Sequence, residues 1–108
     1  MERTGYKVVS VFGGKFFSAI SYTGRIRYKA NVYVEPQEGF GPLAVFDTIF
    51  NATEFRDCCR GGRVIRKCRY VPSRARSLWQ KGGWRLMALP PGTRLAQKVK
   101  LLRGKVRP

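Results

Sequence analysis

Alternating hydrophobic and polar residues along most of the chain predict a protein built mainly from β-strands. Residues 6–12 are rich in β-branched and aromatic side chains, and the Gly13-Gly14 pair that follows supplies the positive φ angles of a tight turn into residues 15–20. Residues 25–34 alternate strictly, with apolar side chains facing one side and mainly basic side chains the other. The pattern therefore predicts a hairpin followed by a half-buried strand.

The middle of the chain predicts a buried strand and then the main helix. Leu43–Phe46 is short and continuously apolar, which is typical of a central strand. Asn51 and Glu54 have the spacing of a helix N-cap and its reciprocal partner, and the Gly61-Gly62 pair is a suitable C-terminal stop. These signals predict a helix over residues 52–60.

The second half predicts up to three more strands. Residues 63–71 place Val64, Cys68 and Tyr70 on one side and mainly basic residues on the other. Residues 86–89 could form a short strand, whereas residues 73–85 are the least regular part of the chain. Residues 93–102 fit both helical and strand spacing, and the Pro-Pro-Gly-Thr sequence before them favours a strand.

Together these elements predict an α+β fold, in which one main helix packs across an antiparallel sheet of about five or six strands. A length of 108 residues is sufficient for one hydrophobic core. We therefore expect a single domain over residues 1–102, followed by a basic C-terminal tail, residues 103–108.

Charge is distributed very unevenly along this chain. It has 22 Lys and Arg against 6 Asp and Glu, a formal net charge of +16. The last acidic residue is Asp57, and 15 of the Lys and Arg residues follow it. A surface kept soluble by charge alone normally mixes both signs, so this imbalance favours an anionic partner. Nucleic acid is the partner that the pattern favours most, and an acidic protein is the alternative.

The residues predicted to contact nucleic acid fall into three groups. The principal segment combines guanidinium groups, which pair with phosphate oxygens, and tryptophans, which stack on unpaired bases: Arg63, Arg66, Lys67, Arg69, Arg74, Arg76, Lys81 and Arg85, with Trp79 and Trp84. The second group is one strand face, Arg25, Arg27 and Lys29, and the third comprises Lys98, Lys100 and Arg103. The alternatives are that the tryptophans anchor the core and that the strand face only prevents edge aggregation.

Several other classes of function are excluded or disfavoured by the composition. The chain has no histidine, and its six carboxylates form no acid–base or metal-binding motif, so we expect no enzyme activity, metal or cofactor. Its three cysteines, Cys58, Cys59 and Cys68, lack the spacing of a zinc site and are expected to be buried thiols of a reducing cytoplasm. Without a long apolar segment or a signal peptide, the sequence predicts a protein of the host cytoplasm or a virion, neither secreted nor membrane-bound.

Parts of the sequence resemble small uncharacterised proteins encoded by bacteriophages and other viruses. The similar stretches are Tyr6–Val9, Gly14–Ala19, Gly41–Asp47 with Asn51, Ala52 and Phe55, Ile65–Cys68, and Pro91–Thr93 with Leu95, Ala96 and Val99. This resemblance implies a small α+β domain of viral or prophage origin. The strand–helix–strand order over residues 43–71 also resembles part of an ADP-ribosyltransferase fold. The missing histidine and the missing glutamate after the last strands imply an inactive version.

The sequence thus predicts a small basic protein that binds nucleic acid largely without sequence specificity, through phosphate contacts. The alternative from another class is a protein-interaction or structural module, such as a virion component or a host-directed inhibitor, that docks an acidic partner. A catalytically inactive ADP-ribosyltransferase-like domain is the third hypothesis, and a cleft lined by Glu54 or Cys58 would favour it.

Overall fold

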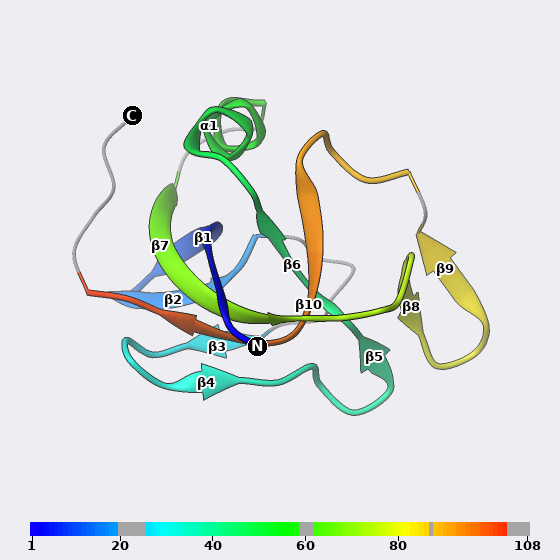
Figure 1. Ribbon diagram of the computed structural model, residues 1–108. Helices are drawn as coiled ribbons and strands as arrows, with labels where there is room; N and C mark the ends of the chain where they lie inside the picture. Colours follow the sequence, from blue (N-terminus) through cyan, green and yellow to red (C-terminus); the bar gives the residue numbers. More distant parts are fainter. Residues whose placement is uncertain (20–25, 59–61, 87, 104–108) are drawn as a thin grey trace.

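The fold consists mainly of antiparallel β-structure with one short helix, in a computed structural model that describes residues 1–19, 26–58, 62–86 and 88–103 (Figure 1). In chain order the elements are β1 (Arg3–Phe12), β2 (Lys15–Ser18), β3 (Arg27–Tyr28), β4 (Tyr33–Val34), β5 (Phe40–Gly41), β6 (Leu43–Phe46), α1 (Ile49–Asp57), β7 (Arg63–Pro72), β8 (Leu78–Gln80), β9 (Trp84–Leu86) and β10 (Thr93–Leu101).

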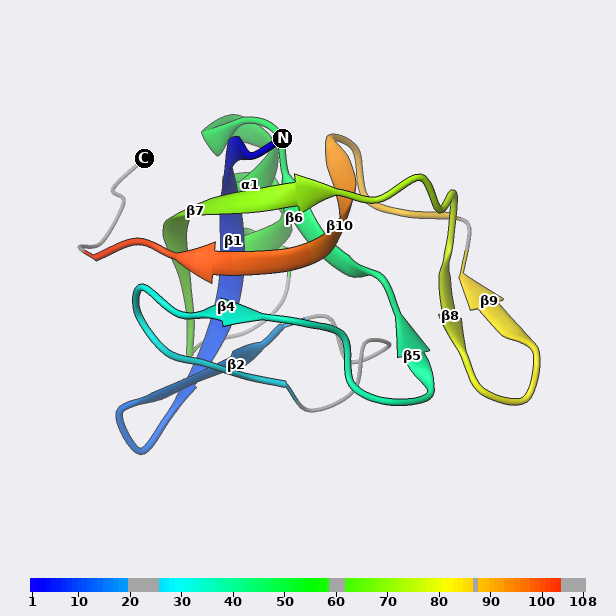
Figure 2. The ribbon, with the colours of Figure 1, turned by 60° about the horizontal axis from the view of Figure 1, so that its bottom comes forward.

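Four of the strands close into a small barrel. β1 pairs with β6 and β7, and β10 also pairs with both of these, so the ring β1–β6–β10–β7 has no free edge. β2 and β3 extend the sheet beyond β1, and β4 extends it beyond β10. Figure 2 shows β7, β10 and β4 side by side across β1. The predicted antiparallel sheet of about five or six strands is therefore corrected to a more β-rich fold, with ten strands among the described residues.

A change of partner along β10 allows the ring to close. Its first half, from Thr93 to Ala96, pairs with β6, and its second half pairs with β7 up to Leu101. The register shifts between Ala96 and Lys98, where β7 takes over as the neighbour. Because a bulge bends and twists a strand, the long β10 can leave one neighbour and join another. Sequence alternation does not reveal such a switch.

The first hairpin forms as predicted, but the next predicted strand is broken. Gly13 and Gly14 have φ angles of 56° and 75° between the paired β1 and β2. Residues 26–34 instead form two short strands, β3 and β4, separated by Asn31 with a φ of 61°. A left-handed residue cannot continue a strand, so the chain turns there and Val32 is exposed.

The helix begins three residues earlier than predicted. Thr48 is its N-cap, and its Oγ1 accepts a hydrogen bond of 3.1 Å from the Asn51 backbone N–H. Asn51 lies inside the helix, where its Nδ2 donates to Asp47 Oδ1 at 3.0 Å. Threonine fulfils the same capping function as asparagine, and the prediction placed the N-cap at Asn51 instead of Thr48. The predicted end at Arg60 lies outside the described residues.

Residues 73–85, the part of the sequence with the least regular pattern, contribute to a second small sheet. β8 and β9 form a hairpin, and β5 pairs with β8 to give the order β5–β8–β9. The predicted strand over residues 86–89 is thus replaced by β9, which ends at Leu86. The remaining predicted strands, β6, β7 and β10, form with bounds close to those expected. The small sheet projects beside the barrel (Figure 1).

The core consists of two hydrophobic clusters. One fills the barrel, and it includes Val9, Tyr28, Leu43 and Val99. The other lies between the barrel wall and α1, and it is formed by the buried residues Val8, Phe46, Ala52 and Ile65. The helix thus covers one side of the barrel (Figure 1).

Two cations occupy inward positions of the barrel. Lys7 is 1% exposed, and its Nζ donates to the Ala44 carbonyl oxygen and lies 5.5 Å from the centre of the Tyr28 ring. Its partner across the β1–β7 ladder is Arg66, which is 7% exposed. Burial lowers the pKa of Lys7 to about 8, an effect partly offset by the neighbouring Cys68.

The thiols do not share one environment. Cys68 is buried in the barrel, and burial raises its pKa to about 12. Burial also raises the pKa of the Tyr28 hydroxyl. Cys58 is exposed at the end of α1, which corrects the prediction that it is buried, and Cys59 lies outside the described residues.

Candidate nucleic-acid interface

A continuous basic surface lies on the outside of the barrel, across β7 and β10. Lys67 and Arg69 point outward between buried neighbours on β7, and Lys100 is the partner of Arg69 on β10. Lys98 and Lys100 place their Nζ atoms 4.5 and 4.8 Å from the centre of the Tyr33 ring on β4. We call this surface the basic sheet face, comprising Lys67, Arg69, Lys98 and Lys100.

The ion pairs found in the described part of the chain are Arg56–Asp57 and Arg94–Asp47, and neither involves the basic sheet face. No carboxylate of the described residues therefore lies within ion-pair distance of this face. Strand alternation directs Lys67 and Arg69 to the same side, and the β7–β10 pairing then adds Lys100 beside them. The tyrosine ring holds two ammonium groups close together by cation–π attraction. Four cations are therefore presented from neighbouring strands without local neutralisation.

A second basic feature lies at one end of the barrel. Arg3 pairs with Tyr70 across β1–β7, and Arg94 pairs with Val45 across β10–β6, so both arginines occupy inward positions where the strands end. With Arg76 they line a cavity of about 390 Å³, which we call the barrel-mouth pocket. Arg94 Nη2 is 3.3 Å from Asp47 Oδ2, whereas no ion pair is found for Arg3 or Arg76 within the described residues. The pocket is thus suited to an anion.

The β8–β9 hairpin carries the exposed tryptophan of the described surface. Trp79 is 39% exposed, and its cross-strand partner on β9 is Arg85. Arg85 is exposed, and its Nη1 donates to Ser77 Oγ at 3.3 Å. Lys81 is exposed at the hairpin turn. The backbone of Trp84 belongs to β9, but its side chain lies outside the described part of the structure.

Two of the predicted contact residues are engaged within the fold. Arg66 is buried, donates from Nη2 to the Leu102 carbonyl oxygen at 2.8 Å, and lies 4.9 Å from the Phe16 ring centre. Arg63 lies 4.8 Å from the Phe55 ring centre and donates to the Phe55 carbonyl oxygen at 3.3 Å. Arg66 is therefore withdrawn from the predicted surface, and Arg63 is directed towards α1.

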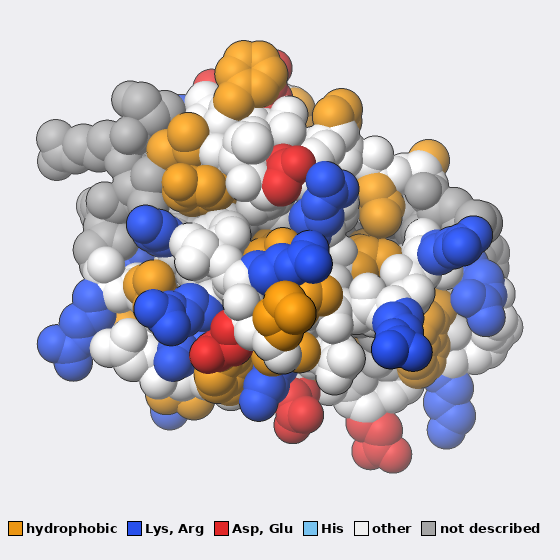
Figure 3. Space-filling model, viewed as in Figure 1, with side chains coloured by type: hydrophobic (Ala, Val, Ile, Leu, Met, Phe, Trp, Pro, Cys, Tyr) orange, Lys and Arg blue, Asp and Glu red, His pale blue; other side chains and the backbone are white. Residues whose placement is uncertain are grey.

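The other predicted cations are dispersed around the molecule. Arg74 is exposed on the segment between β7 and β8, and Arg103 is exposed after β10. Arg27 and Lys29 are exposed at β3, an edge strand of the larger sheet, and Arg25 lies outside the described residues. Figure 3 shows Lys and Arg side chains spread over the middle and lower parts of one face, with fewer Asp and Glu between them. The predicted three groups thus do not merge into a single patch.

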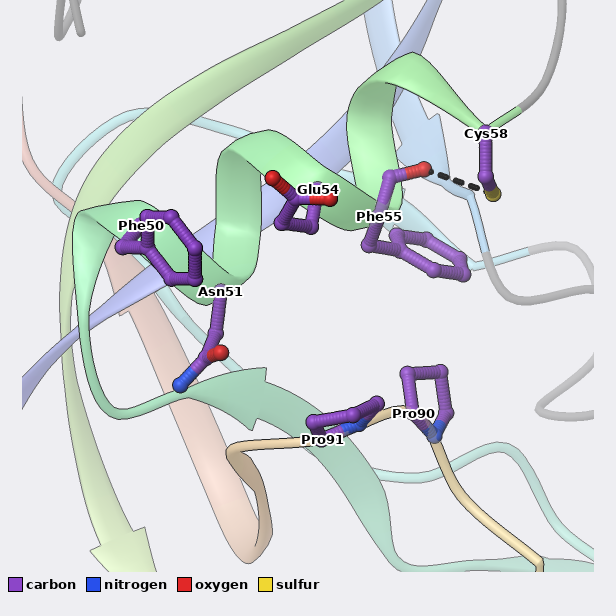
Figure 4. Close-up of a pocket in the computed structure, with 7 residues that line it drawn as sticks. All are labelled: Phe50, Asn51, Glu54, Phe55, Cys58, Pro90 and Pro91. Carbon is purple, nitrogen blue, oxygen red and sulfur yellow. Dashed lines mark hydrogen bonds between the residues drawn. The ribbon is translucent and has the colours of Figure 1, made fainter.

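A groove of about 520 Å³ contains the two residues named for the enzyme-like hypothesis. Glu54 and Cys58 line it together with Phe50, Phe55, Asn51, Pro90 and Pro91, between α1 and the segment before β10 (Figure 4). Its lining is largely apolar and includes no Lys or Arg of the described chain. Cys58 Sγ donates to the Phe55 carbonyl oxygen at 3.0 Å. The groove therefore lacks a cation for the phosphates of a dinucleotide or for a thiolate.

Sequence reasoning did not predict that Arg3 and Arg94 line the same pocket. They are 91 positions apart in the sequence, and only the ring of strands brings their ends together. It also missed Phe40, which lies opposite Gln80 on β5 and so joins the hairpin that carries Trp79. No local signal marks these residues, because isolated arginines at strand ends are common on any surface.

No helix in the described part of the chain has the length and apolar character required to cross a membrane. Comparison of the chain with protein-family models, with curated proteins and with solved structures found no match.

Proposed function

We propose that this protein binds nucleic acid largely independently of sequence, through phosphate contacts made by the basic sheet face. The observation that carries the proposal is the set of four neighbouring cations on β7 and β10 with no carboxylate within ion-pair distance in the described chain. Phosphate groups repeat along a nucleic acid backbone, so adjacent cations on one face can engage successive phosphates. A viral or prophage origin, as the resemblance implies, is compatible with this function.

Binding should depend steeply on salt. If the four cations of the basic sheet face each neutralise one phosphate of a single strand, the slope of log affinity against log salt is about −3. Affinity should then fall roughly 50-fold between about 50 and 200 mM salt. Fluorescence anisotropy with labelled DNA and RNA oligonucleotides at both salt concentrations measures this slope. Undetectable binding at the lower concentration would reject the proposal and favour an acidic protein partner.

Reversing one charge on the basic sheet face locates the contact. Arg69→Glu is expected to weaken oligonucleotide binding about tenfold, because it removes one phosphate contact and repels the next phosphate. Lys15→Glu changes the net charge by the same amount at an exposed position on β2, outside the proposed interface. It is expected to weaken binding less than threefold. Equal losses in the two variants would show that net charge alone attracts the ligand.

A further inference from the structure

Two hollows meet on the surface between β7 and β8. The first is the barrel-mouth pocket, which Arg3 and Arg76 line. The second, which we call the Trp79 groove, is a shallower hollow of about 270 Å³. Besides Trp79, its lining includes Phe40, Gln97, Pro36, Gly41 and Pro42. Ser73 and Ala75 line both hollows, so the two hollows adjoin at this segment of the chain.

The Trp79 groove has a fixed aromatic floor. Gly41 is the partner of Trp79 across β5–β8, and three atoms of the indole lie 2.9 to 3.2 Å from the point that a Gly41 Cβ would occupy. The ring therefore rests against the β5 backbone, and only glycine permits this approach. Phe40 lines the same groove. A base that stacks on this ring meets a platform already held in position, which reduces the entropy lost on binding.

The barrel-mouth pocket supplies the charge that the Trp79 groove lacks. No Lys or Arg of the described chain lines the Trp79 groove, whereas three arginines and the Ser73 and Thr93 residues line the barrel-mouth pocket. Asp47 already neutralises Arg94, which leaves Arg3 and Arg76 for an added anion. An apolar aromatic site beside a site for an anion matches the two parts of a nucleotide, a base and a phosphate joined through one sugar.

We propose that these hollows form the two subsites of one nucleotide in a single strand: an unpaired base stacks on Trp79, and an adjoining phosphate binds Arg3 and Arg76. This inference rests on the proposed function, and it adds that the protein prefers single-stranded to double-stranded nucleic acid. In a duplex the base faces are covered by their neighbours, so the Trp79 platform contributes only to binding of an unpaired strand.

The test compares a labelled single strand of about 12 nucleotides with a duplex of the same length by fluorescence anisotropy. Trp79→Ala is expected to weaken single-strand binding about 10- to 100-fold and duplex binding less than twofold. Trp79→Phe, which retains a stacking ring, should restore most of the loss. Phe12→Ala is the matched control, because Phe12 is an aromatic residue that is 62% exposed on β1, outside both hollows. It should leave both affinities unchanged.

A second variant tests the phosphate subsite. Arg3→Gln combined with Arg76→Gln is expected to make the slope of log affinity against log salt less steep by about 0.7 to 1, because one phosphate contact is lost, whereas Trp79→Ala should leave that slope unchanged. Equal effects of Trp79→Ala on the single strand and the duplex, or no effect on either, would overturn the base subsite. An unchanged slope in the arginine variant would overturn the phosphate subsite. Failure of every oligonucleotide to bind the native chain would instead remove the proposed function itself.

Discussion

Replacing Lys7 with methionine is expected to increase the free energy of unfolding at pH 7 by about 2 kcal/mol. The ammonium group is buried opposite Arg66, and the fall of its pKa from 10.5 to about 8 corresponds to a cost of about 3 kcal/mol for keeping it charged in the fold. Methionine fills a similar volume without that charge. The substitution also removes the hydrogen bond from Lys7 to the Ala44 carbonyl oxygen, worth about 1 kcal/mol, so the net gain is about 2 kcal/mol. Urea denaturation followed by tryptophan fluorescence measures the difference.

The stability of the native chain should also change with pH because of Lys7. Between about pH 8 and pH 10.5 the unfolded chain keeps the Lys7 proton that the folded chain has lost, so stability rises with pH. Above about pH 9 the Cys68 thiol opposes this trend, because it ionises in the unfolded chain but keeps its proton up to about pH 12 in the fold. The net rise is therefore expected between pH 8 and 9, where it amounts to about 1 kcal/mol.

The Lys7→Met variant should lack this rise, and its advantage over the native chain should shrink as the pH increases from 7 to 10. Lys67→Met is the matched control, because Lys67 is an exposed lysine on the adjacent strand β7. It is expected to change stability by less than about 0.5 kcal/mol at every pH. A Lys7→Met chain that is less stable than the native chain at pH 7 would contradict the cost assigned to the buried charge.

Truncating Phe46 to alanine is expected to lower the free energy of unfolding by about 3 to 5 kcal/mol. Phe46 is 1% exposed, and its ring centre lies 5.2 Å from that of Phe55 on α1. It packs with Val8 and Ile65 in the cluster between the barrel and the helix, so its removal leaves a cavity where these layers meet. Because a domain of this size has a total stability of only about 5 to 15 kcal/mol, much of the fold's margin would be lost.

Phe50→Ala provides the comparison for Phe46→Ala. Phe50 lies on α1, the helix against which Phe46 packs, but it is 68% exposed, so its truncation should cost less than about 0.5 kcal/mol. Urea midpoints for both variants, measured together with the native chain, give the two differences. A loss below about 1 kcal/mol for Phe46→Ala would show that the helix is not held to the barrel through this residue.

The elements predicted correctly are those whose signals are local. Gly13 and Gly14 have the positive φ angles that a hairpin turn requires, and the continuously apolar Leu43–Phe46 is buried throughout. The errors arose where a local pattern was compatible with two structures. The alternation over residues 25–34 does not reveal the left-handed Asn31, and Thr48 and Asn51 are both acceptable N-caps.

For the candidate site too, the features that depend on local signals were predicted and those that depend on strand order were not. Alternation on β7 correctly separated inward Cys68 and Tyr70 from outward Lys67 and Arg69. Arg66 was predicted to be part of the binding surface, but it lies on the inward side of β7 and is buried. The pairing of Arg69 with Lys100, and the meeting of Arg3 with Arg94, depend on strand order and register, which individual strands do not specify.

By itself, the sequence determined that the chain forms antiparallel strands with one helix and carries a large excess of positive charge, because side-chain periodicity and ionisation are local properties. Only the tertiary structure decided which cations share a surface, which two are buried in the barrel, and that Trp79 lies against Gly41 beside a pocket of arginines. Closing the ring β1–β6–β10–β7 joins residues far apart in the chain, and that closure results from the packing of one shared core.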